Sequence, residues 1–538
     1  MVISKIFEGL IKLRINESLN NVNILQAGSR KNRGGPDNVF LLRGTIDHHI
    51  FTKKPLYITA YDFEQAFDSL WVEDCMLALK KVGISQEMAQ LIYNLNKSAK
   101  VIVNTPFGPT SAFLTEPIVK QGTVLGSILC STATGEYCDK NLGVMVGTLL
   151  IATLLYVDDI IDLSSSRSEC INSHENAITF SRSKKLTFSG TKCLNMVINP
   201  VKNEDPVELV IDDEKKVVPT SEIVYLGDVF NNLGNNDGLI KDRVRRGTKA
   251  MISISSLMTE TDVGRHKIDV FLLLYFSLFL ATVLFNSQTW SKLRKKDLDQ
   301  LKRMQTKFLK RVVGVAYSTC NAFMFLELGV LPIEYEIDKR RLMYLHRILG
   351  LDKGDPVYKM LENMISLSAT GEHNWWTDME KVLHRYNVVL SLSEIAALGK
   401  GAFRAVVKKA VEGTAFEDLV AECAQKKKTQ HLTYQKFETQ QYLKSFYPQQ
   451  SKIIFKCRSQ TLDIKQHLSY KYDDMVCRGC GLQDETLEHV INCQPVGSDV
   501  DPLETIDFSD SPMLGDKDSR AKILRCTYRV NNFLDLYT

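Results

Sequence analysis

The strongest constraint on the fold lies in residues 154–161, which read Leu-Leu-Tyr-Val-Asp-Asp-Ile-Ile. Short apolar runs on either side of a polar pair predict two buried strands joined by a hairpin turn. Because neighbouring side chains of a strand point to opposite faces, two adjacent aspartates serve one site only at a turn. Asp158 and Asp159 therefore form either an ordinary Asp-Asp turn or an acidic hairpin tip that binds a cation.

A third carboxylate follows another predicted strand. Residues 55–61 read Pro-Leu-Tyr-Ile-Thr-Ala-Tyr, and Asp62 comes directly after them, before a predicted helix start in residues 63–71. Asp62, Asp158 and Asp159 supply three oxygen donors, and Mg²⁺ prefers carboxylates together with substrate phosphates and water. Two such ions about 4 Å apart can activate a 3′-hydroxyl and stabilise a leaving pyrophosphate. The three aspartates therefore predict a catalytic site with two Mg²⁺ ions.

Three sequence blocks resemble those of reverse transcriptases. They are residues 62–68 (Asp-Phe-Glu-Gln-Ala-Phe-Asp), residues 121–126 (Gln-Gly-Thr-Val-Leu-Gly) and residues 156–159 (Tyr-Val-Asp-Asp). Their order and spacing are similar to those of non-LTR, or LINE-type, retrotransposon enzymes, and the resemblance extends from Ser4 to about Pro495. It implies RNA-directed DNA synthesis, in which a DNA primer 3′-hydroxyl is extended with dNTPs on an RNA template.

The resemblance also implies an α+β fold of the right-hand polymerase type. The palm would be built on an antiparallel sheet, with partial fingers, a helical thumb and a small C-terminal zinc knuckle. The expected limits are residues 1–55 for the partial fingers, 56–235 for the palm, 236–350 for the thumb, 351–450 for a helical connector, 451–500 for the knuckle with its basic approach, and 501–538 for a tail.

The resemblance implies roles for further residues. Arg30 resembles an arginine that helps to hold the incoming triphosphate. Phe67 resembles a steric gate that rejects a ribose 2′-hydroxyl, although a core aromatic below the site would fit equally well. Gln121 and Gly122 lie at the start of a predicted helix that ends at Cys138. In the family, residues at these positions contact the template and the incoming nucleotide.

Two later segments complete the implied site. Lys192 stands where family members place a lysine near the pyrophosphate, where it can act as a general acid; a solvated lysine is the alternative. Tyr225, Leu226 and Gly227 resemble the primer-grip hairpin, whose glycine lets the backbone come close to the primer end.

Composition and charge limit the remaining possibilities. The net charge is only +4, so nucleic-acid affinity must come from local basic clusters rather than from the whole molecule. Twelve scattered cysteines suggest a reducing compartment, and the first residues do not resemble a signal peptide. The family resemblance implies an intracellular location, in the nucleus or cytoplasm as a ribonucleoprotein. Residues 270–285 are almost wholly apolar, but they are fewer than the ~20 residues that span a bilayer. They predict a buried helix and no membrane contact.

A second metal motif lies near the C-terminus. Cys477, Cys480, His489 and Cys493 have the spacing Cys-x₂-Cys-x₈-His-x₃-Cys, which suits tetrahedral Zn²⁺. Four protein ligands complete the zinc shell, which favours one structural Zn²⁺ and excludes a zinc hydrolase. The basic residues that precede the motif are expected to approach RNA or DNA phosphates; they are Lys452, Lys456, Arg458, Lys465 and Lys471.

Two functions remain open from the sequence. The three aspartates favour an active polymerase. The first residues resemble the middle of the family's fingers, so we expect a chain truncated at its N-terminus and without an endonuclease. This truncation favours the alternative, a catalytically inactive, retrotransposon-derived nucleic-acid-binding protein.

Overall fold

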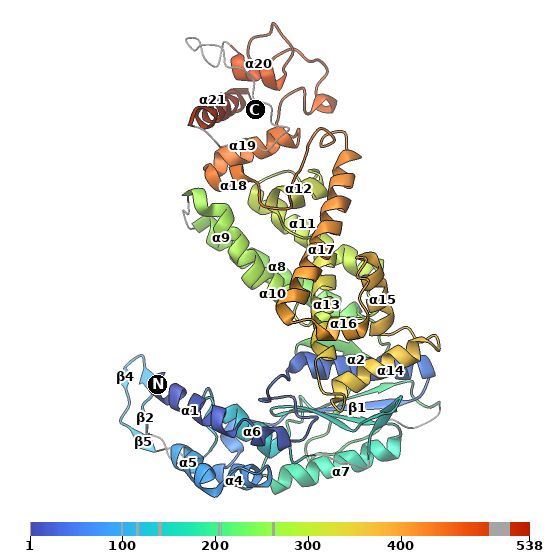
Figure 1. Ribbon diagram of the computed structural model, residues 1–538. Coiled ribbons are helices and arrows are strands. Elements are labelled where there is room, and N and C mark those ends of the chain that lie inside the picture. Colours follow the sequence, from blue (N-terminus) through green and yellow to red (C-terminus); the bar gives the residue numbers. More distant parts are fainter. Residues whose placement is uncertain are drawn as a thin grey trace.

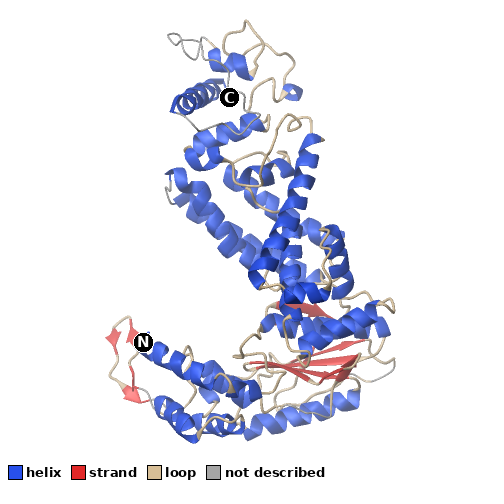
Figure 2. Cartoon of the chain, viewed as in Figure 1, coloured by secondary structure: helices blue, strands red, loops and turns tan. Residues whose placement is uncertain are grey.

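The computed structural model describes residues 2–97, 100–114, 118–137, 142–202, 205, 207–260, 264–493 and 517–537. The molecule is elongated, with a sheet at one end, long helices in the middle and the C-terminal helices at the other end (Figure 1). Strands are concentrated in the sheet and in a small ribbon near the N-terminus, whereas most of the chain is helical (Figure 2). The predicted α+β architecture is therefore confirmed.

A five-stranded sheet forms the base of the predicted palm. Its strand order is β11-β10-β1-β9-β8, with antiparallel pairs except for β11, which is parallel to β10. The strands are β1 (Leu56–Tyr61), β8 (Thr153–Tyr156), β9 (Asp159–Ser164), β10 (Leu194–Ile198) and β11 (Val218–Pro219). The central strand β1 and the β8–β9 hairpin are those that the apolar runs predict.

The two faces of the sheet are covered by different helices. Ile58 belongs to the core that includes α2 (Gly35–Thr52) and α14 (Pro356–Ser368), whereas Tyr57 packs in the core that includes α7 (Arg167–Ser183). This alternation follows from the two-residue period of a strand. A hairpin of β6 (Val144–Val146) and β7 (Leu149–Ile151) extends the first of these cores.

The predicted fingers lie beside the sheet and share a core with its α7 face (Figure 1). The helix that was predicted from residue 121 to Cys138 begins only at Gly126 and ends at Thr134, and Cys138 lies outside the described residues. The elements are α1 (Val2–Ile15), η1 (Ser18–Asn21), α3 (Ala66–Ser69), α4 (Val72–Lys81), α5 (Gln86–Asn96), α6 (Gly126–Thr134) and the short strands β2 (Lys100–Val101), β3 (Asn104–Thr105), β4 (Gly108–Pro109) and β5 (Phe113–Leu114).

The predicted thumb rises from a second hairpin, β12 (Glu222–Tyr225) and β13 (Asp228–Asn231). Its helices bury one aromatic-rich core, in which Phe308 packs edge-on against Phe271. They are α8 (Asp237–Glu260), η2 (Gly264–His266), α9 (Lys267–Leu274), a π-helical turn (Tyr275–Leu280), α10 (Ala281–Val283), η4 (Ser287–Thr289), α11 (Lys295–Val313) and α12 (Asn321–Leu328).

The apolar segment around residues 270–285 is only partly buried. Within the helical stretch Gly264–Val283, which is long and apolar enough to span a membrane, about a third of the residues are buried. Tyr275 and Phe279 lie in the thumb core, but Leu273 and Phe276 are exposed. The predicted helix is therefore buried on one side only, with its other side exposed.

The connector helices pack mainly on the palm. They are α13 (Ile333–Leu349), α14, α15 (Trp375–Arg385), α16 (Leu392–Ala397) and α17 (Lys400–Ala424). α17 joins two cores, since Phe403 near its start packs with the palm and Leu419 near its end packs with the thumb. The limits expected at residues 350 and 450 therefore cut across continuous cores.

The C-terminal end contains a helix that the sequence did not predict. α21 (Lys517–Tyr537) packs on α19 (Pro448–Arg458) and α20 (Leu487–Asn492), and its Cys526 and Phe533 are fully buried. The short helix α18 (Gln441–Ser445) and the turn η5 (Ser469–Lys471) complete this end. Residues 494–516 of the expected knuckle and tail lie outside the described residues.

Two residues of the expected basic approach are not available to nucleic acid. Arg458 is fully buried and forms a 2.9 Å ion pair with the equally buried Glu327 of α12. Lys465 is also buried and pairs with Asp474 at 2.6 Å. The first pair joins α19 to α12, whereas the second lies within the segment that precedes the cysteines. The predicted basic approach is therefore reduced to three lysines.

Candidate active site

Three carboxylates meet at one edge of the palm sheet. Tyr61, the last residue of β1, pairs with Ile160 of β9, so Asp62 comes out of the sheet beside Asp159. Asp158 occupies the two-residue turn between β8 and β9, where Tyr156 pairs with Asp159. Each of the three side chains is half-buried. The register of two neighbouring strands thus brings together residues that lie far apart in the sequence.

Burial and neighbouring charges both disfavour ionisation of Asp158 and Asp159. Burial, together with the negative charges of Asp158 and Asp62, raises the pKa of Asp159 from its ordinary 3.8 to about 6. Burial and Asp62 also raise the pKa of Asp158. Like charges that share a partly desolvated site disfavour ionisation. A cation would remove this repulsion, and the oxygen-only donor set fits a hard ion such as Mg²⁺.

The turn that carries Asp158 is held from the fingers side. Gln26 accepts a hydrogen bond from the N–H of Val157 at 2.9 Å and donates one to the carbonyl of the same residue at 3.1 Å. The Gln26 amide also receives the N–H of Gly28 at 2.8 Å and donates to the hydroxyl of Thr134 at 3.0 Å. The sequence did not single out Gln26, because its partner lies 131 residues away.

Gly28 lets the fingers loop approach this turn. A Cβ atom added at Gly28 would lie 2.5 Å from the backbone nitrogen of Val157. Contacts this short do not occur between real atoms, so only glycine fits at this position without a shift of the turn.

Lys192 lies beside Asp62. Its Nζ atom is 3.1 Å from Oδ2 of Asp62, and its side chain is largely exposed. The backbone around Asp62 is fixed by the same loop, since Ser189 donates its N–H to the Asp62 carbonyl at 2.9 Å. The structure thus places the lysine at the acidic site, as the sequence predicts.

The hairpin of residues 222–231 lies next to the acidic turn. Leu226 (φ +45°) and Gly227 (φ +85°) form its two-residue tip, and a Cβ added at Gly35 would lie 3.6 Å from Leu226 and 3.9 Å from Tyr156. Tyr225, however, points into the core and accepts a 3.0 Å hydrogen bond from Asn38. The tip itself, rather than the Tyr225 ring, faces the site.

Buried charges tie this hairpin to the thumb. Arg243 of α8 forms an ion pair with Asp228 and donates to the carbonyl of Gly227 at 2.9 Å. Asn286 donates to the carbonyl of Leu226 at 3.0 Å, and Arg43 of α2 lies 3.7 Å from Asp228. Both carbonyls of the tip are therefore fixed by side chains that follow it in the chain.

The comparison with known families identifies the region that contains the carboxylates. The family described as "Reverse transcriptase (RNA-dependent DNA polymerase)" matches residues 1–230. These residues form a reverse transcriptase domain.

Curated relatives of this chain are polymerases of mobile elements. The probable RNA-directed DNA polymerase from transposon BS of Drosophila melanogaster is 23% identical over 363 residues, which cover 64% of this chain and 39% of that protein. The RNA-directed DNA polymerase from mobile element jockey of Drosophila funebris is 22% identical over 335 residues, which cover 59% and 35%. The chain thus spans less than half the length of these relatives. They confirm the predicted resemblance to LINE-type reverse transcriptases.

A solved structure is also similar. The apo telomerase from Candida tropicalis is 13% identical, and the match covers 76% of this chain and 61% of that one with a TM-score of 0.36. This score is too low to support an inference.

Arg30 of the reverse transcriptase domain is hydrogen-bonded to the backbone of a nearby loop. Its guanidinium donates hydrogen bonds to the backbone carbonyls of Val22 (3.0 Å), Asn23 (2.8 Å) and Asn20 (3.2 Å). In this conformation Arg30 stabilises the loop that follows α1, and its contact with the incoming triphosphate stays a prediction. Ser29, the residue before it, has a left-handed backbone (φ +59°).

The remaining predicted residues of the domain lie around the site. Phe67 is half-buried at the edge of the fingers core, so both of its proposed roles remain open. Gln121 is exposed and donates to Asp68 at 3.4 Å. Gly122 has a left-handed backbone (φ +73°), and a Cβ there would meet nothing within 4 Å. Both residues therefore border open space. They precede α6 in the chain and are not part of that helix.

The four C-terminal ligand candidates converge as predicted. The ligand atoms of Cys477, Cys480, His489 and Cys493 all lie within 4.8 Å of one another. Cys480 Sγ is 3.2 Å from His489 Nε2, and Cys477 Sγ is 3.8 Å from Cys493 Sγ. The latter spacing is close to the about 3.8 Å edge of a tetrahedron with zinc–sulfur bonds of about 2.3 Å.

Two contacts build this cluster locally. Thr486 caps α20 by accepting the N–H of His489 at 3.1 Å, which fixes the helix turn that presents the imidazole. The buried Glu485 pairs with Arg478 at 2.7 Å and also accepts the Arg478 N–H at 2.9 Å. The loop that carries Cys477 and Cys480 is thereby joined to the start of α20.

Proposed function

We propose that this chain is the RNA-directed DNA polymerase of a LINE-type retrotransposon, extending a DNA primer 3′-hydroxyl with dNTPs on an RNA template. The main support is the convergence of Asp62, Asp158 and Asp159 at the end of two neighbouring strands, where burial and the charge of Asp62 raise the pKa of Asp158 and of Asp159. Perturbed carboxylates in a half-buried cluster are typical of functional sites. The family match over residues 1–230 gives the reaction class.

The same three aspartates would hold two Mg²⁺ ions. When bound, these ions would lower the pKa of the attacking 3′-hydroxyl and stabilise charge on the leaving pyrophosphate. The chain itself contributes positioning, because Gln26 and Gly28 fix the turn that carries Asp158. Lys192, whose Nζ atom lies 3.1 Å from Asp62, would donate a proton to the leaving pyrophosphate.

Residues at the rim would orient the substrates. Gln121 and Gly122 border open space beside Asp68 and would contact the template and the incoming nucleotide. The Leu226–Gly227 tip would support the primer end through its backbone. Phe67 would exclude the ribose 2′-hydroxyl; ribonucleotide incorporation by a Phe67→Val variant that keeps its stability would support this role, and loss of stability would favour a core role.

The C-terminal cluster would hold one structural Zn²⁺. Three sulfurs and one imidazole nitrogen at near-tetrahedral spacing match the donor set that zinc prefers. We infer that this zinc knuckle stabilises its own small fold and adds affinity for RNA template and primer. An intracellular location, in the nucleus or cytoplasm, belongs to the same proposal, and fractionation of expressing cells tests it.

The alternative is a retrotransposon-derived protein that binds nucleic acid without catalysis. A labelled DNA primer annealed to an RNA template separates the two functions. The polymerase requires Mg²⁺- and dNTP-dependent extension by the purified chain. Tight binding of the same substrate with no extension above a blank would favour the alternative.

A further inference from the structure

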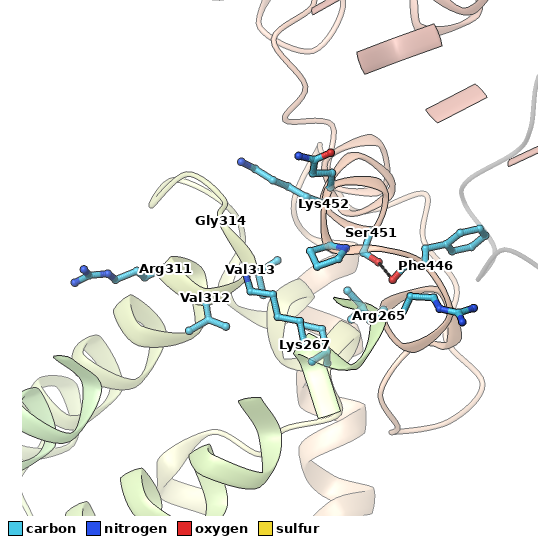
Figure 3. Close-up of a pocket in the computed structure, with 13 residues that line it drawn as sticks. Arg265, Lys267, Arg311, Val312, Val313, Gly314, Phe446, Ser451 and Lys452 are labelled. Carbon is cyan, nitrogen blue, oxygen red and sulfur yellow. Dashed lines mark hydrogen bonds between the residues drawn. The ribbon is translucent and has the colours of Figure 1, made fainter. Parts of the chain in front are cut away.

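A cavity lies where the thumb meets the C-terminal helices. Its volume is about 270 Å³, and it is lined by the start of α9, the end of α11 and residues of α18 and α19 (Figure 3). Four of its lining side chains are cationic, namely Arg265, Lys267, Arg311 and Lys452, and none is acidic. The cavity is therefore electropositive, in a chain whose net charge is only +4.

The four cations have no carboxylate partner within 4.0 Å among the described residues. Some other cations of the thumb do have a partner; Arg245, for example, lies 2.7 Å from Asp242. Cations that share one rim without compensating carboxylates repel one another, and an anionic ligand relieves this repulsion.

Two contacts define the rim between the thumb and the C-terminal helices. The guanidinium of Arg265 lies 5.7 Å from the ring centre of Tyr447, the residue before α19. On the other side, the stem of Lys452 crosses Gly314, where an added Cβ would lie 3.3 Å from Lys452 Cε. Each contact joins a cation of one region to the backbone or ring of the other.

The floor of the cavity is apolar, and an aromatic ring lies beside it. Ile268, Val313 and Phe446 line the floor and are nearly buried. Tyr447 is 55% exposed next to the rim, so its ring is accessible to a ligand. Cations on a rim, combined with an accessible aromatic ring, are the features with which proteins bind single-stranded nucleic acid.

We propose that this cavity is a second nucleic-acid site, which binds the backbone phosphates of a single-stranded segment while a base stacks on Tyr447. The cations come from α9, α11 and α19 and their flanking turns, so they are spread in a way that suits successive phosphates rather than one small anion. The inference rests on the proposed function, since the single strand would belong to the template outside the primer duplex.

The direct test is binding of a fluorescein-labelled 12-nucleotide oligo(U), measured by anisotropy at several salt concentrations. We expect the double variant Arg311→Glu/Lys452→Glu to raise Kd at least about tenfold. Its salt slope should fall by roughly 1.4, since each phosphate contact on a single strand contributes roughly 0.7. The matched control is Lys409→Glu, an exposed lysine of α17 away from the cavity, which should change Kd less than twofold.

Three further variants test the site without reversing any charge. Arg311→Gln/Lys452→Gln should lower affinity in the same direction, and Tyr447→Ala should weaken binding whereas Tyr447→Phe retains it. Wild-type affinity in both double variants would overturn the proposal. Equal competition by a poly-glutamate peptide of the same length would also overturn it, because the cavity would then bind any polyanion.

A second assay distinguishes failure of this binding site from failure of the proposed polymerase function. Extension of a primer on a template with a one-nucleotide overhang leaves no long single strand to bind. If the wild-type chain fails to extend this substrate but the oligo(U) results hold, the polymerase proposal fails alone. If extension occurs and the double variants bind oligo(U) as the wild type does, only the second site is refuted.

Discussion

Gln26 holds the backbone of Val157 by both its N–H and its carbonyl group, at 2.9 and 3.1 Å. Val157 has a left-handed backbone (φ +60°), which is unfavourable for a β-branched residue and persists only where the surroundings enforce it. Because Val157 precedes Asp158, one fully buried amide side chain sets the shape of the turn that carries two of the three carboxylates.

The first prediction follows from this contact. Gln26→Leu leaves the N–H groups of Val157 and Gly28 without a partner, and a buried unsatisfied donor costs about 1–3 kcal/mol. We expect the free energy of unfolding to fall by about 2 kcal/mol or more, and primer extension to fall at least about tenfold. Denaturant unfolding and extension assays measure both effects. The exposed Gln90→Leu should stay within about 0.5 kcal/mol of the wild type; equal effects in the two variants would contradict the role of Gln26.

The second prediction concerns the junction of palm and thumb. Arg243 is nearly fully buried and pairs with the buried Asp228, so Arg243→Met removes one of the two cations beside that carboxylate and leaves only Arg43, at 3.7 Å. Breaking one partner of a buried pair costs about 3–5 kcal/mol. The neighbouring Arg245→Met removes only an exposed pair with Asp242 and should cost less than about 1 kcal/mol. Thermal unfolding of both variants distinguishes them, and similar midpoints would refute the buried network.

The third prediction is a pH dependence in metal-free protein. The pKa of Asp159 is about 6 in the folded state, above its ordinary 3.8, so the folded state binds the proton more tightly. The stability that this proton supplies is present below about pH 4 and is lost as the pH rises through about 6. Asp159→Asn should therefore gain about 2–3 kcal/mol over the wild type between pH 4 and pH 7.5 in EDTA.

Mg²⁺ supplies the control for this titration. At pH 7.5 the ion should stabilise the wild-type protein and reduce the advantage of Asp159→Asn, because it compensates the carboxylates directly. A stability difference between the two proteins that does not vary with pH would show that Asp159 is not held in a repulsive cluster.

The fourth prediction separates the zinc cluster from catalysis. We expect one Zn²⁺ per chain by atomic absorption, lost in Cys480→Ser and retained in Cys320→Ser, whose sulfur lies outside the cluster. Loss of zinc should weaken binding of long nucleic acid but leave extension of a short, saturating primer-template largely intact. Wild-type protein without zinc, or a Cys480→Ser variant that is inactive at saturation, would contradict this modular role.

Local patterns predicted the parts of the site that depend on neighbouring residues. The apolar runs around Asp158 and Asp159 gave the β8–β9 hairpin, and the Cys-x₂-Cys spacing gave a cluster that converges. The inward direction of Tyr225 was also predictable, because Ile223 and Tyr225 share one face of a two-residue repeat.

Contacts between distant segments could not be read from the sequence. The partner of Gln26 lies 131 residues away, and so does Glu327, the partner of Arg458. Arg458 therefore looked like a surface cation although it is fully buried. α21 was missed for a similar reason, since Cys526 and Phe533 are buried against α19 and α20 rather than within a recognisable motif.

Extension of a DNA primer on an RNA template, compared between the wild type and Asp158→Asn, tests the central claim most directly. The account predicts Mg²⁺-dependent extension by the wild type and a rate at least ~1000-fold lower in Asp158→Asn, on the scale of several kcal/mol of lost charge stabilisation. The exposed Asp213→Asn should extend at the wild-type rate. Near-wild-type extension by Asp158→Asn would contradict the assignment of Asp62, Asp158 and Asp159 as the catalytic carboxylates.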